Sequence, residues 1–123
     1  RDRIIDEILK IDGVSLNGSR KKRVCNNVNV SFGDIEGEAV GGLLNAEGIC
    51  TSTGSACSSK SLDPSHVLLA MGLSPQEANS SLRITISRFT TEDDINAFLK
   101  VLPKVVKKLR KLSPFAKFLR KTN

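Results

Sequence analysis

With 123 residues, 39% of them hydrophobic, the chain is expected to fold as one domain, residues 1–123, around a core of its own. No apolar run is long enough to cross a membrane and the first residues do not resemble a signal peptide, so a membrane-spanning or secreted protein is not expected. The three cysteines are an odd number without a disulfide framework, which favours a reducing cytoplasm, and the net charge of +6 raises nucleic acids and anionic membranes as partners to weigh.

Residues 4–32 predict a helix followed by two strands. Apolar residues recur at helical spacing up to Asp12-Gly13, which should end the helix: Ile4, Ile5, Ile8, Leu9 and Ile11. The chain lacks an initiator Met and opens inside this helix, so a piece of a longer protein is expected. Residues 14–16 indicate a short strand before the turn signal Asn17-Gly18, and the basic residues 19–23 are expected to be solvated. Residues 27–32 alternate, which puts Val28, Val30 and Phe32 on one face of a second strand.

A second helix is predicted for residues 36–47. Its apolar stripe comprises Ala39, Val40, Leu43 and Leu44, and Gly48 is placed to cap its C-terminus. Three glycines within it each weaken a helix by roughly 1 kcal/mol relative to alanine. We therefore expect Gly37, Gly41 and Gly42 to permit close packing against a neighbouring element.

The next stretch, residues 51–61, contains no large apolar side chain and one cysteine, Cys57. Glycine, serine and alanine give a backbone with little steric bulk, so we expect residues 53–61 to form a mobile loop. Lys60, and also His66 if it lies nearby, would favour the Cys57 thiolate. This arrangement suits a nucleophilic cysteine.

Three other interpretations of this stretch are a structural cysteine, a phosphate-binding loop and a metal site. Burial as a structural cysteine is the common fate of a lone Cys, but the surrounding serines argue against it. Residues 54–61 nearly spell a phosphate-binding loop, yet Ser59 stands where glycine is needed before the lysine. A metal site built from Cys25, Cys50, Cys57 and His66 has no C-x-x-C pair, so this signal is weak.

Two short helices and a strand follow. Asp63 or Ser61 is expected to cap a helix that has Pro64 in its first turn and ends at Met71-Gly72, and residues 74–78 predict another helical turn. Residues 82–86 form the clearest strand, with Leu82, Ile84 and Ile86 on one face and Arg83 and Thr85 on the other. Arg83 is therefore held on a rigid backbone away from the core. Its guanidinium suits either a salt bridge or a carboxylate ligand.

The last helix is predicted to begin at Thr90 or Thr91, with acidic residues in its first turn, and to kink at Pro103. Its apolar stripe comprises Ile95, Phe98, Leu99, Leu102, Val105, Val106, Leu109 and Leu112. Much of the excess positive charge lies after residue 100, and Trp and Tyr are absent, so a solvated face is favoured over nucleic-acid binding. Residues 115–121 form a small amphipathic tail that could pack or dock. Together these elements predict an α+β fold, a small, mainly antiparallel sheet with helices on one side.

Several linked motifs resemble the C-terminal part of NifS-like cysteine desulfurases, in the class V aminotransferase family. The resemblance runs from about Asn27 to about Leu112 in the family's order and spacing. It rests on Ser52-Thr53-Gly54-Ser55-Ala56-Cys57, Leu62-Asp63-Pro64-Ser65-His66-Val67-Leu68, Met71-Gly72-Leu73, and Ser80-Ser81-Leu82-Arg83-Ile84-Thr85-Ile86-Ser87-Arg88-Phe89-Thr90-Thr91-Glu92.

This resemblance implies the small C-terminal domain of a fold-type I enzyme that uses pyridoxal phosphate. Such enzymes take sulfur from L-cysteine and leave L-alanine and an enzyme persulfide. Cys57 would be the nucleophile that becomes the persulfide, and Arg83 would bind the substrate carboxylate. The resemblance also implies a homodimer at full length, no membrane partner, and an iron–sulfur scaffold or sulfur-relay protein as acceptor.

One departure from the family pattern concerns the cofactor. The family's Schiff-base lysine lies in a Ser-x-His-Lys context, whereas the only histidine here, His66, precedes Val67. The large cofactor domain is expected to be missing from this chain, so the chain alone is expected to be inactive. The alternative hypothesis is a binding module, either a stand-alone sulfur carrier that needs only Cys57 or a basic α+β domain for nucleic acid.

Overall fold

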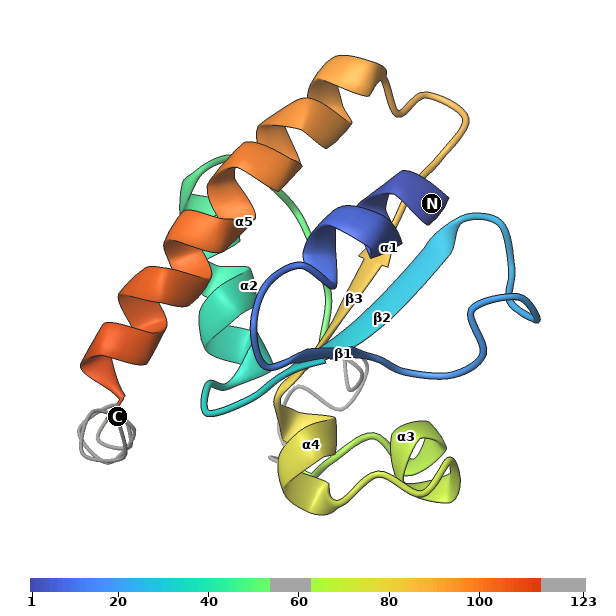
Figure 1. The fold of residues 1–123 in the computed structure, drawn as a ribbon, viewed down its shortest axis with the longest axis vertical. Helices are drawn as coiled ribbons and strands as arrows, with labels where there is room; N and C mark the ends of the chain where they lie inside the picture. The colour runs from blue at the N-terminus through green and yellow to red at the C-terminus, as the bar shows by residue number, and fades with distance from the viewer. Residues whose placement is uncertain (54–62, 114–123) are drawn as a thin grey trace.

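A computed structural model describes residues 1–53 and 63–113, which form a three-stranded antiparallel sheet with helices (Figure 1). This arrangement confirms the predicted α+β class. In chain order the elements are α1 (Asp2–Ile8), β1 (Val14–Leu16), β2 (Asn27–Phe32), α2 (Gly37–Ala46), α3 (His66–Ala70), α4 (Pro75–Asn79), β3 (Ser81–Thr85) and α5 (Glu92–Leu112).

The sheet has the strand order β1-β2-β3, and its register separates an apolar face from a polar one. Val30 of β2 lies opposite Leu16 on one side and Leu82 on the other, so the apolar residues of three strands share a face. Val28, Val30 and Phe32 are at most 2% exposed, which confirms the orientation predicted from their alternation.

The helices α1, α2 and α5 cover the apolar face and complete the core (Figure 1). Helix α1 ends at Ile8, earlier than predicted, because the next N–H groups bond three residues back, from Lys10 to Glu7 and from Ile11 to Ile8. Leu9 is consequently 39% exposed, whereas Ile11 still packs against the core.

Helix α2 packs closely against the backbone of β3 at a glycine. A β-carbon at Gly37 would lie 1.9 Å from the carbonyl oxygen of Ser81, so the predicted close packing is confirmed at this position. At Gly42 a β-carbon would meet nothing within 4 Å, so the prediction is wrong there. Ala39 is exposed rather than part of the buried stripe, because that stripe follows Gly37, Val40 and Leu44.

The short helices α3 and α4 lie at the end of the sheet where β2 ends and β3 begins (Figure 1). Ser65 caps α3 by accepting a hydrogen bond from the Leu68 N–H, so Pro64 precedes the helix and the predicted caps at Asp63 or Ser61 are wrong. Ser74 and Glu77 form a reciprocal capping box on α4. The side chain of Ser31 on β2 donates to the Glu77 carbonyl at 2.9 Å, which ties α4 to the sheet.

Helix α5 starts after Thr91, as predicted, with a capping box between Thr91 and Asp94. It runs without a break through Pro103, whose missing N–H leaves the Leu99 carbonyl without its helical donor; the kink stays a prediction. Leu112 is 73% exposed and does not belong to the buried stripe. Within the described ranges, no helix is long and apolar enough to cross a membrane.

Candidate functional site

The face of the sheet opposite the core carries polar side chains. Because strand residues alternate between faces, Asn27, Asn29 and Ser31 of β2 point away from the apolar helices. Each lies opposite a polar residue of β3, and Asn29 is paired directly with Arg83. The orientation predicted for Arg83, away from the core, is therefore observed.

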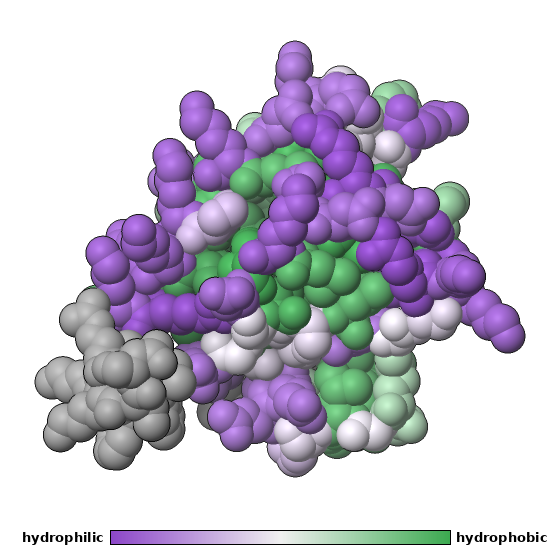
Figure 2. Space-filling view, in the orientation of Figure 1, coloured by the Kyte–Doolittle hydropathy of each residue, from purple (hydrophilic) through white to green (hydrophobic). Residues whose placement is uncertain are grey.

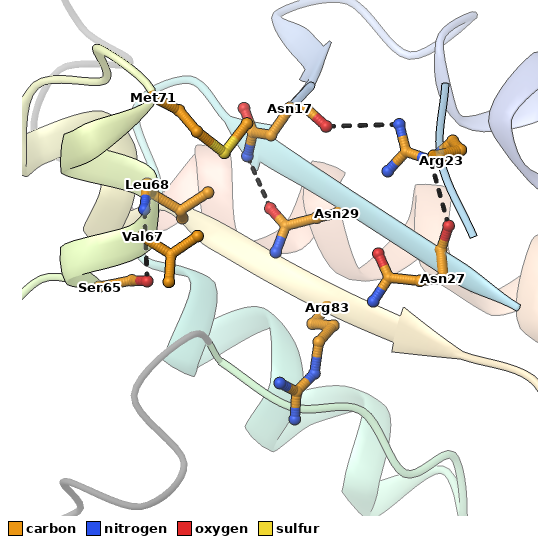
Figure 3. A pocket seen from close by; sticks show the side chains of 9 residues that line it. All are labelled: Asn17, Arg23, Asn27, Asn29, Ser65, Val67, Leu68, Met71 and Arg83. Atoms are coloured by element: carbon orange, nitrogen blue, oxygen red, sulfur yellow. Dashed lines mark hydrogen bonds between the residues drawn. The ribbon is translucent and has the colours of Figure 1, made fainter. Parts of the chain in front are cut away.

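Helix α3 stands beside this face and borders an open pocket of about 270 Å³ (Figure 3). The strands supply a polar floor and α3 supplies an apolar wall. The lining residues are Asn17, Arg23, Asn27, Asn29, Ser65, Val67, Leu68, Met71 and Arg83. A polar floor beside an apolar wall fits a small ligand with one charged end.

A hydrogen-bond network fixes the orientation of Asn29 in the pocket. The amide of Asn17, a residue only 7% exposed, donates to Asn29 Oδ1 at 2.7 Å and to Ser31 Oγ at 2.8 Å. The hydroxyl of Ser31 in turn donates to the Glu77 carbonyl. Asn29 thus has its oxygen engaged, and its amide nitrogen is turned away from Asn17 (Figure 3).

The two arginines of the pocket have different surroundings. Arg23 donates to three backbone carbonyls, those of Asn17, Ser19 and Asn27, at 3.2–3.3 Å. Burial, and secondarily the nearby charge of Arg1, lowers the pKa of Arg23. Arg23 therefore holds the 17–27 loop in shape and has few donors left for a ligand.

Arg83 is partly buried and belongs to none of the ion pairs between described residues. Its Nη2 donates to Ser52 Oγ at 3.4 Å, the one side-chain hydrogen bond that the described part of the chain gives it. The salt bridge weighed from the sequence is thus not formed among these residues. A guanidinium without a carboxylate at the edge of a pocket is suited to bind an anionic ligand.

The segment that leads toward Cys57 is joined to the Arg83 backbone. Ser52 and Arg83 form an antiparallel bridge, with N–H···O distances of 3.1 Å from Ser52 to Arg83 and 2.6 Å in the reverse direction. Cys57 and Lys60 themselves lie outside the described residues, as does the predicted mobile loop except for Thr53.

The remaining candidate residues are spread over the surface. His66 is the exposed first residue of α3. Cys25 and Cys50 are free and exposed, and no group of three metal-ligating residues occurs in residues 1–53 and 63–113.

Sequence reasoning missed Asn17, Asn29 and Ser52. The pair Asn17-Gly18 predicts a turn, and Gly18 adopts a positive φ of 83°, but a turn signal does not predict side-chain contacts of Asn17. The alternation of residues 27–32 places Asn29 on the polar face of the strand, but it does not predict a pocket there. Nothing in the sequence indicated that Ser52 would pair with β3.

The chain is similar in sequence to one protein family and to several proteins of known name. The family model described as aminotransferase class-V matches residues 1–98. Cysteine desulfurase IscS 1 of Archaeoglobus fulgidus is 54% identical over 114 residues, covering 93% of this chain and 30% of that protein. Cysteine desulfurase IscS of Methanosarcina thermophila is 51% identical, with coverage of 93% and 28%.

A solved structure described as a NifS-like protein has the same fold. It matches with a TM-score of 0.75 and 27% sequence identity, covering 89% of this chain and 27% of that chain. The chain therefore spans about 30% of the length of the curated relatives it matches.

Proposed function

Because the chain belongs to the class-V aminotransferase family, we propose that it is the C-terminal part of a cysteine desulfurase. The observation that carries this proposal is Arg83, whose guanidinium lines a pocket and has no carboxylate partner among the described residues. The proposed reaction converts L-cysteine to L-alanine and leaves a persulfide on Cys57.

In this reaction Arg83 binds the carboxylate of the substrate. A guanidinium offers parallel N–H donors that match both carboxylate oxygens, and this pairing also fixes the orientation of the amino acid. The Asn29 amide and the apolar residues of α3 would surround the rest of a small amino acid. The volume of about 270 Å³ is appropriate for a ligand of this size.

Cys57 receives the sulfur. Its thiolate attacks the substrate sulfur, so that a sulfur–sulfur bond forms as the carbon–sulfur bond breaks. The electron pair stays on the substrate carbon, which is then protonated to give alanine. The bridge between Ser52 and Arg83 supports this role, because it starts the Cys57 segment next to the carboxylate-binding residue.

The described residues do not fit pyridoxal phosphate as its complete binding site. The pocket is lined by two arginines and by no lysine that could form a Schiff base. We propose that a large domain of the same enzyme, beyond this chain, holds the cofactor, which would supply the electron sink. The present chain alone is then inactive, and the full enzyme is proposed to be a cytoplasmic homodimer.

The proposed sulfur acceptor is an iron–sulfur scaffold or sulfur-relay protein, and α5 offers it a surface. Five exposed lysines, Lys100, Lys104, Lys107, Lys108 and Lys111, follow helical spacing along one side of α5. No ion pair between described residues includes them, and the outer side of α5 is hydrophilic (Figure 2). We call these residues the α5 lysine stripe, which would suit an acidic partner surface.

The proposal is tested with the complete enzyme supplied with pyridoxal phosphate and L-cysteine. Cys57→Ser should abolish persulfide formation and leave the absorbance of the bound cofactor unchanged, and Arg83→Lys should raise the KM for cysteine at least tenfold. Cys25→Ser and Cys50→Ser are the matched controls and should retain activity. Persulfide formation by the Cys57→Ser enzyme would contradict the assignment.

A further inference from the structure

Ser52 contacts Arg83 through both its backbone and its side chain. The two backbone bonds of this isolated bridge hold Ser52 beside Arg83 of β3. In addition, Arg83 Nη2 lies 3.4 Å from Ser52 Oγ. The guanidinium of Arg83 points away from the side chain of Asn29 (Figure 3), although Asn29 is its partner in the register of the sheet.

The hydroxyl of Ser52 can only accept a hydrogen bond from Arg83. A hydroxyl has one hydrogen, and that of Ser52 is donated to the Thr53 carbonyl at 3.0 Å. Its lone pairs remain available to accept the bond from Arg83 Nη2. The contact is therefore directional, because the carbonyl of Thr53 sets the rotation of the hydroxyl.

We propose that Ser52 is a positioning residue that sets which edge of the Arg83 guanidinium meets the substrate carboxylate. Nη2 carries two hydrogens, one on each of the two edges that can pair with a carboxylate. The hydrogen bond to Ser52 occupies one of these hydrogens, so the edge that contains it has only one N–H donor left for the substrate. The other edge keeps both of its N–H donors for a bidentate pair with the carboxylate. This inference rests on the proposed function and adds a determinant of substrate orientation to it.

A neutral hydroxyl acceptor suits this role better than a carboxylate would. An aspartate at the same place would neutralise Arg83 and compete with the substrate for it. Ser52 directs the guanidinium while leaving its positive charge uncompensated by the described residues. The pocket therefore keeps its attraction for an anionic ligand.

The test compares Ser52→Thr with Ser52→Val in the complete, cofactor-loaded enzyme. These side chains have nearly the same shape and differ in the hydroxyl, and neither removes the backbone bridge. The probes are L-alanine, which carries the carboxylate, and ethylamine, which lacks it. Binding is followed from the change in cofactor absorbance, without turnover.

The expected result separates the two probes. Ser52→Val should weaken L-alanine binding about five- to tenfold, the scale of one ordinary hydrogen bond, and leave ethylamine binding unchanged. Ser52→Thr should bind both probes like the wild type. With L-cysteine, Ser52→Val should raise KM by the same factor at constant kcat.

Two control experiments test whether the effect of Ser52→Val is merely structural. Thr51→Val removes a neighbouring hydroxyl whose buried oxygen has no hydrogen-bond partner among the described residues, and should change the binding of neither probe. In an Arg83→Ala background, Ser52→Val should have no further effect on L-alanine binding, since the group it positions is gone.

If Ser52→Val weakened the binding of both probes equally, the proposed role of Ser52 would be wrong. The same would follow if Ser52→Val weakened L-alanine binding as much in the Arg83→Ala background as in the wild type. Wild-type L-alanine affinity in Ser52→Val would also contradict this role. Failure of the proposed function is a different outcome: the wild-type enzyme would then form no persulfide from L-cysteine, whatever residue stands at position 52.

Discussion

Gly37 begins α2 where a larger residue has no room. Its missing β-carbon would lie 1.9 Å from the Ser81 carbonyl oxygen and 2.7 Å from the carbonyl carbon, and backbone atoms cannot move aside as a side-chain end can. Gly37→Ala should therefore separate α2 from β3 and lower the free energy of unfolding by about 3 kcal/mol, at the upper end of ordinary overpacking effects. Chemical denaturation measures this change.

Gly42 provides the matched control in the same helix. A β-carbon there meets nothing within 4 Å, so Gly42→Ala should raise the free energy of unfolding by up to about 1 kcal/mol through helix propensity. If both alanine variants changed stability in the same direction, the contact between α2 and β3 could not be the cause.

The three cysteines provide a second prediction at the residue scale. Cys25 and Cys50 are both exposed, so access to solvent alone cannot make Cys57 react first. The predicted advantage of Cys57 is a larger thiolate fraction, which Lys60 would favour. Brief alkylation of the 123-residue chain at pH 7, followed by peptide mapping, should label Cys57 before the other two.

Lys60→Gln provides the control, because it removes the cation that would favour the Cys57 thiolate and should slow the labelling of Cys57 alone. Equal rates at pH 7 would indicate that the polar loop does not activate its thiol, and the nucleophilic role would lose its support.

At the scale of elements, α5 depends on its capping box. Asp94 accepts from the Thr91 backbone N–H at 2.8 Å and from its hydroxyl at 2.9 Å, and these bonds hold the pKa of Asp94 below its usual range. A lowered folded-state pKa adds stability above the unfolded pKa, near 4, and this stability is lost as the pH falls through the folded value. Asp94→Asn should therefore be less stable than the wild type at pH 7, and the difference should shrink below pH 4.

Thermal unfolding of both proteins between pH 7 and pH 2.5 measures this difference. Asp93→Asn is the matched control, because Asp93 lies in the same first turn and makes no capping bond in the structure. A difference for Asp94→Asn that does not change with pH would show that the carboxylate charge does not contribute through the cap.

Most elements could be predicted from local patterns, whereas the pocket could not. Alternation in residues 27–32 and 82–86 predicted the orientation of Val30 and Arg83, because period-two alternation follows directly from strand geometry. The bridge of Ser52 to β3 joins residues 31 positions apart, and the amide of Asn17 reaches across the sheet to Ser31. These contacts depend on tertiary packing, which no local window contains.

At the scale of the whole molecule, the α5 lysine stripe provides the prediction about partners. Changing Lys104, Lys107 and Lys111 together to glutamate should weaken binding of an acidic acceptor protein at least tenfold at low salt. The rate of alanine release without acceptor should stay the same, because the stripe lies on α5 and contributes no residue to the pocket. Titration calorimetry and an alanine assay measure the two quantities.

A nucleic-acid partner would behave differently in this experiment. Its affinity would fall steeply with the logarithm of the salt concentration for any sequence, since phosphate contacts release counterions. Tight, salt-sensitive binding of random single strands, abolished by the same three substitutions, would favour the nucleic-acid module over the desulfurase acceptor.

The contact between the first and last helices determines the order in which this chain can fold during synthesis. Arg3 on α1 pairs with Glu92 at 2.6 Å and bonds to Asn96 at 2.5 Å, so α1 meets a helix made 89 residues later. Until α5 leaves the ribosome, the isoleucines of α1 and the apolar face of the sheet cannot pack against the apolar side of α5 and remain partly exposed to solvent. A nascent chain stalled before residue 92 should therefore bind chaperones that recognise apolar segments, and release of the last helix should end that dependence.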